Sequence, residues 1–373
     1  MRIAILWTGL SGYLNACLKA LARHDQAQLL VVHQIPEANA PFDDAQFAWM
    51  KNRLEWRTEK DLGSLSDRVR DFDPEILVFA GWHLAHYRQV ARERAGKSWR
   101  VMTMDNCWLA TIRQRLAVLA SPWFPRPLAD AAWLAGERQA VFARKLGFEE
   151  RNIMRGLYSC DLPPMEEAYL QRVQARRPLG RAFLFVGRFI EEKGIDTLAA
   201  AYASYRERSL DPWPLICCGA GPLSNHIEGR AGISVRGFVQ PDQLPSIFAQ
   251  VGCLLLPSRF EPWAVVVHEA AAAGLPILAS ERVGSIVHLV QPGLNGFIFD
   301  AGDTEGLARL LIRISNSSAQ RLEAMSEASH CLSLQYSPTR WAETLLDGYH
   351  FSSDARLSNA KPLQPIARID LNG

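Results

Sequence analysis

The chain has 373 residues, which favours two domains over one, because a single hydrophobic core stops growing near about 250–300 residues. Hydrophobic residues make up 48% and charged residues 21% of it, which excludes the disordered, collagenous and coiled-coil classes. A formal net charge of +2 is too small for a protein whose main task is to coat nucleic acid. The seven cysteines are scattered without CxxC spacing, so we expect neither disulfides nor a zinc site, and a reducing cytoplasm fits best.

Short apolar runs bounded by turns recur along the chain. They lie at 3–7, 29–32, 75–80, 100–104, 182–187, 214–219, 253–257 and 276–280, with helix-length segments between them. Such runs are typical of strands buried on both faces, and the alternation of strand and helix predicts right-handed crossovers and parallel sheets. We therefore predict an α/β fold with two doubly wound parallel-sheet domains that face a central cleft.

The alternation lapses between residues 162 and 181, in a stretch with three prolines and a charged helical segment. We place the domain boundary there, with residues 1–164 as the first domain and 165–350 as the second. The tail 351–373 loses periodicity, and we expect it to be loosely held or to cross back to the first domain. No run of about 18 apolar residues occurs, so no transmembrane helix is expected.

Two doubly wound domains that face each other place their ligand crevice at the carboxyl ends of the strands. The turn after the first strand contains Gly9 and Gly12, which permit close approach of the backbone to a ligand. A third glycine at dinucleotide-fingerprint spacing is missing, so a plain strand-to-helix turn is an equal alternative.

Residues 253–280 predict a strand, a loop with Glu261, and a helix that begins near Pro262 and points its N-terminus into the crevice. Free N–H groups there suit phosphate. Glu269 follows Glu261 by eight residues, or about 12 Å along a helix, against about 5–5.5 Å for the carboxylates of a retaining glycosidase. The two glutamates would therefore hold different parts of a long ligand, unless they are only a capping and a solvated residue.

A second turn, residues 186–194, follows the first strand of the second domain and carries Arg188 and Lys193. The planar fork of arginine and the point charge of lysine together suit a diphosphate. A solvated pair is the alternative. A glycine turn at 219–222 and the segment 235–239 each follow another strand of the same domain.

These segments resemble the retaining glycosyltransferases of family 4, which have the two-domain GT-B fold. The family's donor-diphosphate turn is matched by VGRFIEEKGID, its glycine turn by CCGAGPL, the strand before its base pocket by VRGFV, and its E-x7-E motif by FEPWAVVVHEA. The similarity is dense over residues 182–314. In the first domain only residues 128–161 and the TGLSGY turn are similar.

The resemblance implies that Arg188 and Lys193 hold the donor diphosphate. Glu269 would bind the ribose hydroxyls, Glu261 would contact the donor sugar, and N–H groups of Val265 and Val266 would reach phosphate. The implied donor site further includes Gly9, Gly12, Gly187, Gly219 and Phe238. Ala264 departs from the family, where glycine is common, and its methyl group would narrow the sugar pocket.

The first domain supplies the remaining candidates. His83 lies where the family often carries a histidine near the donor sugar, so we group it with Arg188, Lys193 and Glu261 as catalytic; a structural histidine is the alternative. Asp105 and Asn106 follow the strand at 100–104, where acceptor-side polar residues are expected. Trp82 and Trp108 are candidates for stacking on sugar rings, although most tryptophans lie in cores.

A basic stretch lies in the first domain. Residues 88–126 contain eight Arg and Lys against two acidic residues, namely Arg88, Arg92, Arg94, Lys97, Arg100, Arg113, Arg115 and Arg126 against Glu93 and Asp105. This excess predicts attraction to anionic lipid or to an anionic glycan. A solvated helix face is the alternative.

The resemblance thus implies a retaining glycosyltransferase that moves a sugar from a UDP-sugar to a glycan or lipid-linked acceptor, in cell-surface polysaccharide, lipopolysaccharide or glycolipid synthesis. We expect no metal and no other cofactor, because Arg188, Lys193 and a helix N-terminus would neutralise the leaving phosphate. We expect the protein in the cytoplasm, bound peripherally to the inner face of the cell membrane. A nucleotide-sugar epimerase of similar fold and a non-catalytic sugar-nucleotide-binding subunit are the alternatives.

Overall fold

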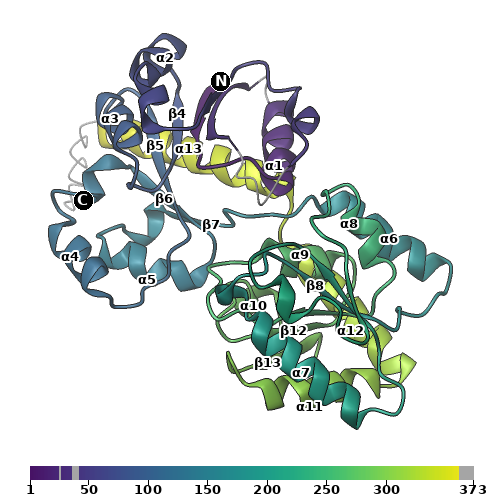
Figure 1. Cartoon of the computed structure of the whole chain (residues 1–373). Coiled ribbons are helices and arrows are strands. Elements are labelled where there is room, and N and C mark those ends of the chain that lie inside the picture. The colour runs from purple at the N-terminus through teal and green to yellow at the C-terminus, as the bar shows by residue number, and fades with distance from the viewer. Residues whose placement is uncertain (25–26, 36–41, 361–373) are drawn as a thin grey trace, which may run out of the picture.

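A computed structural model describes residues 1–24, 27–35 and 42–360, which fold into two α/β domains (Figure 1). The first domain has a seven-stranded parallel sheet in the order β3-β2-β1-β4-β5-β6-β7. Its strands are β1 (Arg2–Leu6), β2 (Gln28–Gln34), β3 (Arg53–Trp56), β4 (Ile76–Ala80), β5 (Trp99–Met104), β6 (Ala131–Leu134) and β7 (Ile153–Arg155). Its helices are α1 (Gly12–Arg23), α2 (Leu65–Phe72), α3 (Ala85–Glu93), α4 (Ile112–Ala120) and α5 (Glu137–Lys145).

The second domain has a six-stranded parallel sheet in the order β10-β9-β8-β11-β12-β13. Its strands are β8 (Phe183–Val186), β9 (Leu215–Cys218), β10 (Ile233–Val235), β11 (Cys253–Leu256), β12 (Ile277–Ser280) and β13 (Gly296–Phe299). Its helices are α6 (Leu162–Gln174), α7 (Ile195–Arg208), α8 (Leu244–Phe248), α9 (Val265–Ala272), α10 (Ile286–Leu289), α11 (Thr304–Ser315) and α12 (Ala319–Ser333). The prediction of two doubly wound parallel-sheet domains is therefore confirmed.

Each sheet is buried on both faces, which explains why its strands are apolar throughout. In β1, Ile3 and Ile5 belong to the core on one face of the sheet, whereas Ala4 and Leu6 belong to the core on the other. All six residues of β5 are buried. Within the described residues, no helix has the length and apolar character to cross a bilayer.

The last described helix, α13 (Pro338–Ala360), returns to the first domain (yellow in Figure 1). It packs against α1, and Trp341, Leu345 and Leu346 lie in the first-domain core. The ring of Trp341 lies 4.6 Å from that of Trp133, and its Nε1–H donates to the carbonyl of Leu157 at 2.7 Å.

The expected domain limits of 164 and 350 therefore need correction. Residue 164 lies inside α6, which packs against α8 and α9 and so belongs wholly to the second domain. Residues 338–350 belong to the first domain, because the apolar side chains of α13 recur at helical spacing and cover its sheet. Of the expected tail, residues 351–360 continue α13, and 361–373 lie outside the described residues.

Candidate functional site

Two loops of the second domain meet because they follow neighbouring strands. β8 and β11 pair in the sheet, so the turn after β8 lies beside the loop after β11. The N–H groups of Arg259 and Phe260 donate to the carbonyl of Glu192 at 2.8 and 3.2 Å. Gly194 has φ +66°, and a Cβ there would lie 2.1 Å from the carbonyl oxygen of Pro257, so only glycine permits this approach.

The approach brings Lys193 and Glu261 together. The ammonium of Lys193 contacts the Glu261 carboxylate in an ion pair, and the two side chains are 18% and 11% exposed. From the sequence, these residues were assigned to the diphosphate and to the donor sugar respectively. In the structure the two residues pair with each other, and neither lines the two cavities described below.

A cavity of about 460 Å³ lies between the domains. Predicted donor-site residues that line it are Gly12, Gly187, Arg188, Gly219, Phe238 and Glu269. Gly219 has φ +148°, and a Cβ there would lie 1.9 Å from the carbonyl oxygen of Gly187, which explains the glycine at this turn. The Phe238 ring meets the Phe42 ring of the first domain edge-on, with centroids 5.4 Å apart.

Three carboxyl groups line this interdomain cavity: Glu269 from α9, Asp161 from the chain crossing before α6, and Asp242 from the segment before α8. Burial, and then the charge of Asp161, raise the pKa of Glu269 from 4.5 to about 7. Burial also raises the pKa of Asp161. Glu269 can therefore change its charge near neutral pH, inside a cavity large enough for a nucleotide.

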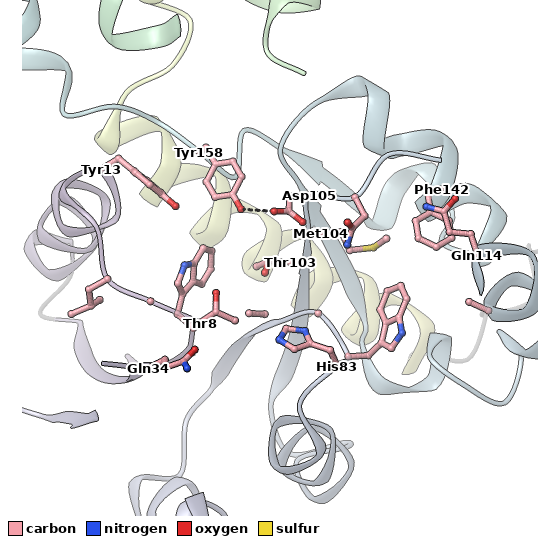
Figure 2. Close-up of a pocket in the computed structure, with 18 of the residues that line it drawn as sticks. Thr8, Tyr13, Gln34, His83, Thr103, Met104, Asp105, Gln114, Phe142 and Tyr158 are labelled. Atoms are coloured by element: carbon pink, nitrogen blue, oxygen red, sulfur yellow. Dashed lines mark hydrogen bonds between the residues drawn. The ribbon is translucent and has the colours of Figure 1, made fainter. Parts of the chain in front are cut away.

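A larger cavity of about 900 Å³ lies at the carboxyl ends of the first-domain strands. Predicted residues that line it are Gly9, Trp82, His83, Asp105 and Asn106 (Figure 2). Arg188 reaches it from the second domain and also lines the interdomain cavity. Gly9 therefore lines this cavity, whereas Gly12, predicted for the same donor site, lines the interdomain cavity.

Asp105 is anchored inside the larger cavity. The Tyr158 hydroxyl donates to its carboxylate at 3.3 Å (dashed in Figure 2). Burial raises the pKa of Asp105, and the Tyr13 ring supports Tyr158 edge-on with centroids 5.5 Å apart. A held carboxyl group of this kind can accept a hydrogen bond from a hydroxyl-bearing ligand.

Gln139 connects this cavity to the second domain. It is fully buried, and its Nε2 donates to the carbonyls of Asp105 at 3.1 Å and Pro262 at 2.9 Å. Its Oε1 accepts from the N–H of Gly136 at 3.1 Å. One amide thus fixes the loop after β5 against the loop that carries Glu261.

Helix α9 begins at Val265 and not near Pro262 as predicted. The residue before it, Ala264, has φ +73° and ψ 87°, a left-handed conformation that favours glycine. Val265 and Val266 lie half-buried in the first turn, and neither lines the two cavities. The turn before the helix, and not a proline at its first position, therefore sets its direction.

Two sequence features lie outside the site. Trp108 was expected on the acceptor side, but it packs against the first-domain core, 5.6 Å from the Phe142 ring and 5.0 Å from Lys145 Nζ. The sequence interpretation found no DxD triplet, which is wrong, because residues 71–73 form one. There Asp73 pairs with Arg2 and Arg94, before the amino end of β4 and so at the opposite edge of the sheet from the cavities.

The sequence interpretation also missed functional neighbours. Tyr13, Gln139, Tyr158 and Asp161 lie in segments that resemble the family but were given no role, yet each touches or lines a cavity. Tyr158 and Asp161 follow β7. Recognition of this short strand, the last of the first sheet, would have marked the segment after it as part of the crevice.

Part of the chain is similar to a known protein family. Residues 171–330 match the profile of the family "Glycosyl transferases group 1". A D-inositol 3-phosphate glycosyltransferase from Corynebacterium urealyticum is 32% identical over 195 residues, 47% of this chain and 45% of that protein. The 2-deoxystreptamine glucosyltransferase of Streptomyces kanamyceticus is 26% identical over 221 residues, 56% of this chain and 57% of that protein. The chain spans about half the length of these curated relatives.

Solved structures resemble the whole chain. HepE from Anabaena, in complex with UDP and glucose, has a TM-score of 0.71 at 15% identity, over 94% of this chain and 99% of HepE. Sucrose-phosphate synthase from Thermosynechococcus elongatus has a TM-score of 0.69 at 15% identity, over 96% and 100%. The chain therefore has the GT-B fold, and its second domain contains the match to the glycosyl transferases group 1.

Proposed function

We propose that the protein is a retaining, metal-independent glycosyltransferase of family 4, with Glu261 and Glu269 as its E-x7-E pair. It transfers a sugar from a UDP-sugar to a glycan or lipid-linked acceptor, in the cytoplasm, for a cell-surface polysaccharide, lipopolysaccharide or glycolipid. The observation that carries the proposal is the position of Arg188, which lines both the interdomain cavity and the first-domain cavity. In this proposal the nucleotide occupies the interdomain cavity and the sugars occupy the first-domain cavity. A cation that lines both cavities lies where the sugar–phosphate bond would break.

The proposed reaction breaks the bond between the anomeric carbon and the β-phosphate oxygen, and the electron pair stays on the phosphate. Arg188 stabilises the charge that develops there. An acceptor hydroxyl attacks the anomeric carbon from the face that the phosphate leaves, so the configuration is retained. Its proton passes to the leaving phosphate oxygen, and no enzymatic nucleophile is required.

The two cavities divide the substrates in this proposal. The nucleoside lies in the interdomain cavity, with its base near Phe238 and its ribose hydroxyls donating to Glu269. The donor sugar and the acceptor share the first-domain cavity, where Asp105 orients the acceptor and His83 faces the donor sugar. UDP is the favoured nucleotide because HepE, which shares the fold, was solved with it.

Thermal unfolding with UDP, GDP, ADP and CMP tests the donor assignment. At a hundredfold excess over Kd, a bound nucleotide raises Tm by roughly 5–10 °C. We expect this rise for UDP, and a smaller one in Arg188→Ala. Shifts below about one degree for all four nucleotides would contradict the proposal.

Turnover separates the proposal from its alternatives. A transferase releases UDP faster when acceptor is present and works unchanged in EDTA. An epimerase would convert the donor sugar without releasing UDP, and a non-catalytic subunit would bind UDP without turnover. Either of these two results would contradict the proposed transferase activity and support the corresponding alternative.

A further inference from the structure

Helix α4 presents its apolar side chains outward. None of its nine residues is buried. Ile112, Leu116 and Leu119 recur at helical spacing and are 78%, 60% and 73% exposed. Leu109 before the helix and Trp123 after it are 54% and 80% exposed. These five side chains, called here the α4 face, reverse the usual arrangement, in which a helix turns its apolar stripe toward the core.

The inner side of α4 is formed by other residues than the α4 face. Thr111, Arg113, Gln114 and Ala117 line the first-domain cavity. Val118 packs against the core behind it. Figure 1 shows α4 on the outer side of the first domain, away from the second domain. A contiguous exposed apolar patch with a tryptophan at its edge is typical of an interaction surface.

The positive charge around the α4 face favours an anionic partner. Between Asp105 and Asp130 the chain carries Arg113, Arg115 and Arg126 and no acidic residue. Arg113 and Arg115 are exposed on α4 itself. Apolar side chains and a tryptophan interleaved with arginines suit the interface of an anionic bilayer, where the rings and chains enter the headgroup region and the guanidinium groups meet phosphate.

Only part of the basic stretch at residues 88–126 is available to a partner. Arg94 and Arg100 are buried and pair with Asp73 and Asp130. Arg88 donates to the carbonyls of Trp82 and His83 at 2.9 and 3.0 Å. These three arginines hold the first domain together, and Arg126 likewise donates to the carbonyls of Gly147 and Ala129. The exposed basic residues that remain are Arg113 and Arg115 on α4, with Arg92 and Lys97 nearer the start of the stretch.

We propose that the α4 face docks the protein on an anionic phospholipid surface and thereby places the first-domain cavity at the bilayer. Docking itself follows from the α4 face alone. The consequence that the acceptor is a lipid-anchored molecule rests on the proposed function, because α4 both faces outward and forms a wall of the cavity assigned to the acceptor.

Co-sedimentation with vesicles tests the docking. The wild type is expected to bind vesicles that contain phosphatidylglycerol, to bind pure phosphatidylcholine more weakly, and to be released by salt. Replacing Ile112, Leu119 and Trp123 together by Ser is expected to reduce partitioning at least about tenfold, because each side chain loses apolar burial. The fold is expected to persist, since all three are exposed. Leu210→Ser is the matched control, as Leu210 is fully exposed in the second domain.

Three results would overturn the docking: no binding of the wild type to anionic vesicles at low salt, equal binding of the triple variant, or a solution dimer that the triple variant dissociates. The last result would assign the α4 face to a second copy of the chain. The UDP-induced rise in Tm is measured on the same samples. Vesicle binding without that rise would remove the proposed function and leave docking in place, and the reverse result would remove docking alone.

Discussion

The ammonium of Lys193 and the carboxylate of Glu261 form an ion pair across 68 residues of sequence, at the point where two loops of the second domain meet. Each charge is largely removed from water, so each depends on the other. In the proposed reaction, the same lysine also lies within the motif assigned to the donor diphosphate. Lys193 would therefore have two roles: it stabilises the contact between the two loops, and it supplies a positive charge for the donor diphosphate.

We expect Lys193→Met to lower stability by roughly 1–3 kcal/mol, because it leaves the Glu261 carboxylate shielded and unpaired. Lys193→Met combined with Glu261→Gln is expected to recover most of that loss. Urea unfolding of the single and double variants measures the coupling. Losses that simply add would show that the two side chains do not stabilise each other.

Replacement of Arg188 is expected to lower turnover far more than affinity. Its guanidinium is exposed, so Arg188→Ala retains the wild-type Tm, while kcat falls by about 10²–10³ because charge on the leaving phosphate is no longer stabilised. Arg188→Lys does not rescue, since the planar fork is lost. Arg230→Ala, at an exposed position of the same domain, is the control. Near-normal kcat in Arg188→Ala would exclude this role.

Glu269 makes both stability and nucleotide binding depend on pH. Its folded pKa is raised from 4.5 to about 7, so its favourable contribution is present below pH 4.5 and is lost as pH rises through about 7. Glu269→Gln is therefore expected to be more stable than the wild type by about 1–3 kcal/mol above pH 7, with the difference vanishing near pH 4.5.

The same variant is expected to bind UDP more weakly, and the rise of wild-type affinity through neutral pH is expected to disappear, because only the ionised carboxylate accepts strongly from ribose hydroxyls. Asp161→Asn removes a neighbouring charge and shifts this rise to lower pH. Calorimetric titration over the neutral range measures both effects. A wild-type affinity that does not change with pH would contradict the assignment of Glu269 to the ribose.

Ala264→Gly is expected to stabilise the protein. The left-handed backbone of Ala264 costs about 1–2 kcal/mol for a residue with a Cβ, while the glycine adds about 0.4–1 kcal/mol of unfolded-state entropy. The net gain is roughly 0.5–1 kcal/mol, visible as a small rise in Tm. Ala271→Gly, inside α9, is the matched control with the opposite sign. Equal destabilisation by both changes would show that Ala264 is not strained.

The sequence predicted the fold well where strands are buried on both faces. The eight apolar runs all became strands, because a parallel sheet covered by helices demands continuous apolar segments. The edge strands β3 and β7 were missed, because they are only partly buried and contain charged residues, so neither has a continuous apolar run. Candidate site residues that follow the predicted strands line a cavity, as His83, Asp105 and Arg188 show.

Other parts of the site depend on tertiary contacts that no local pattern encodes. The partner of Lys193 follows from the pairing of β8 with β11, and Gln139 acts across the domain boundary because α5 faces the loop after β11. The charge count along the sequence overestimated the number of exposed basic residues, because Arg94 and Arg100 are buried. The packing of α13 against the first domain could not be predicted either, because the contacts of this helix exist only in the folded core.

The return of α13 affects how the chain reaches its native state during synthesis. The strands of the first domain leave the ribosome before the second domain does, yet Trp341, Leu345 and Leu346, which complete one side of the first-domain core, leave after it. Until they arrive, Leu14, Leu18 and the sheet face beneath α13 lack their cover, while the entire second domain is made in between. The nascent chain therefore exposes an apolar face throughout that interval, and the first domain gains its full stability only after α13 has been made.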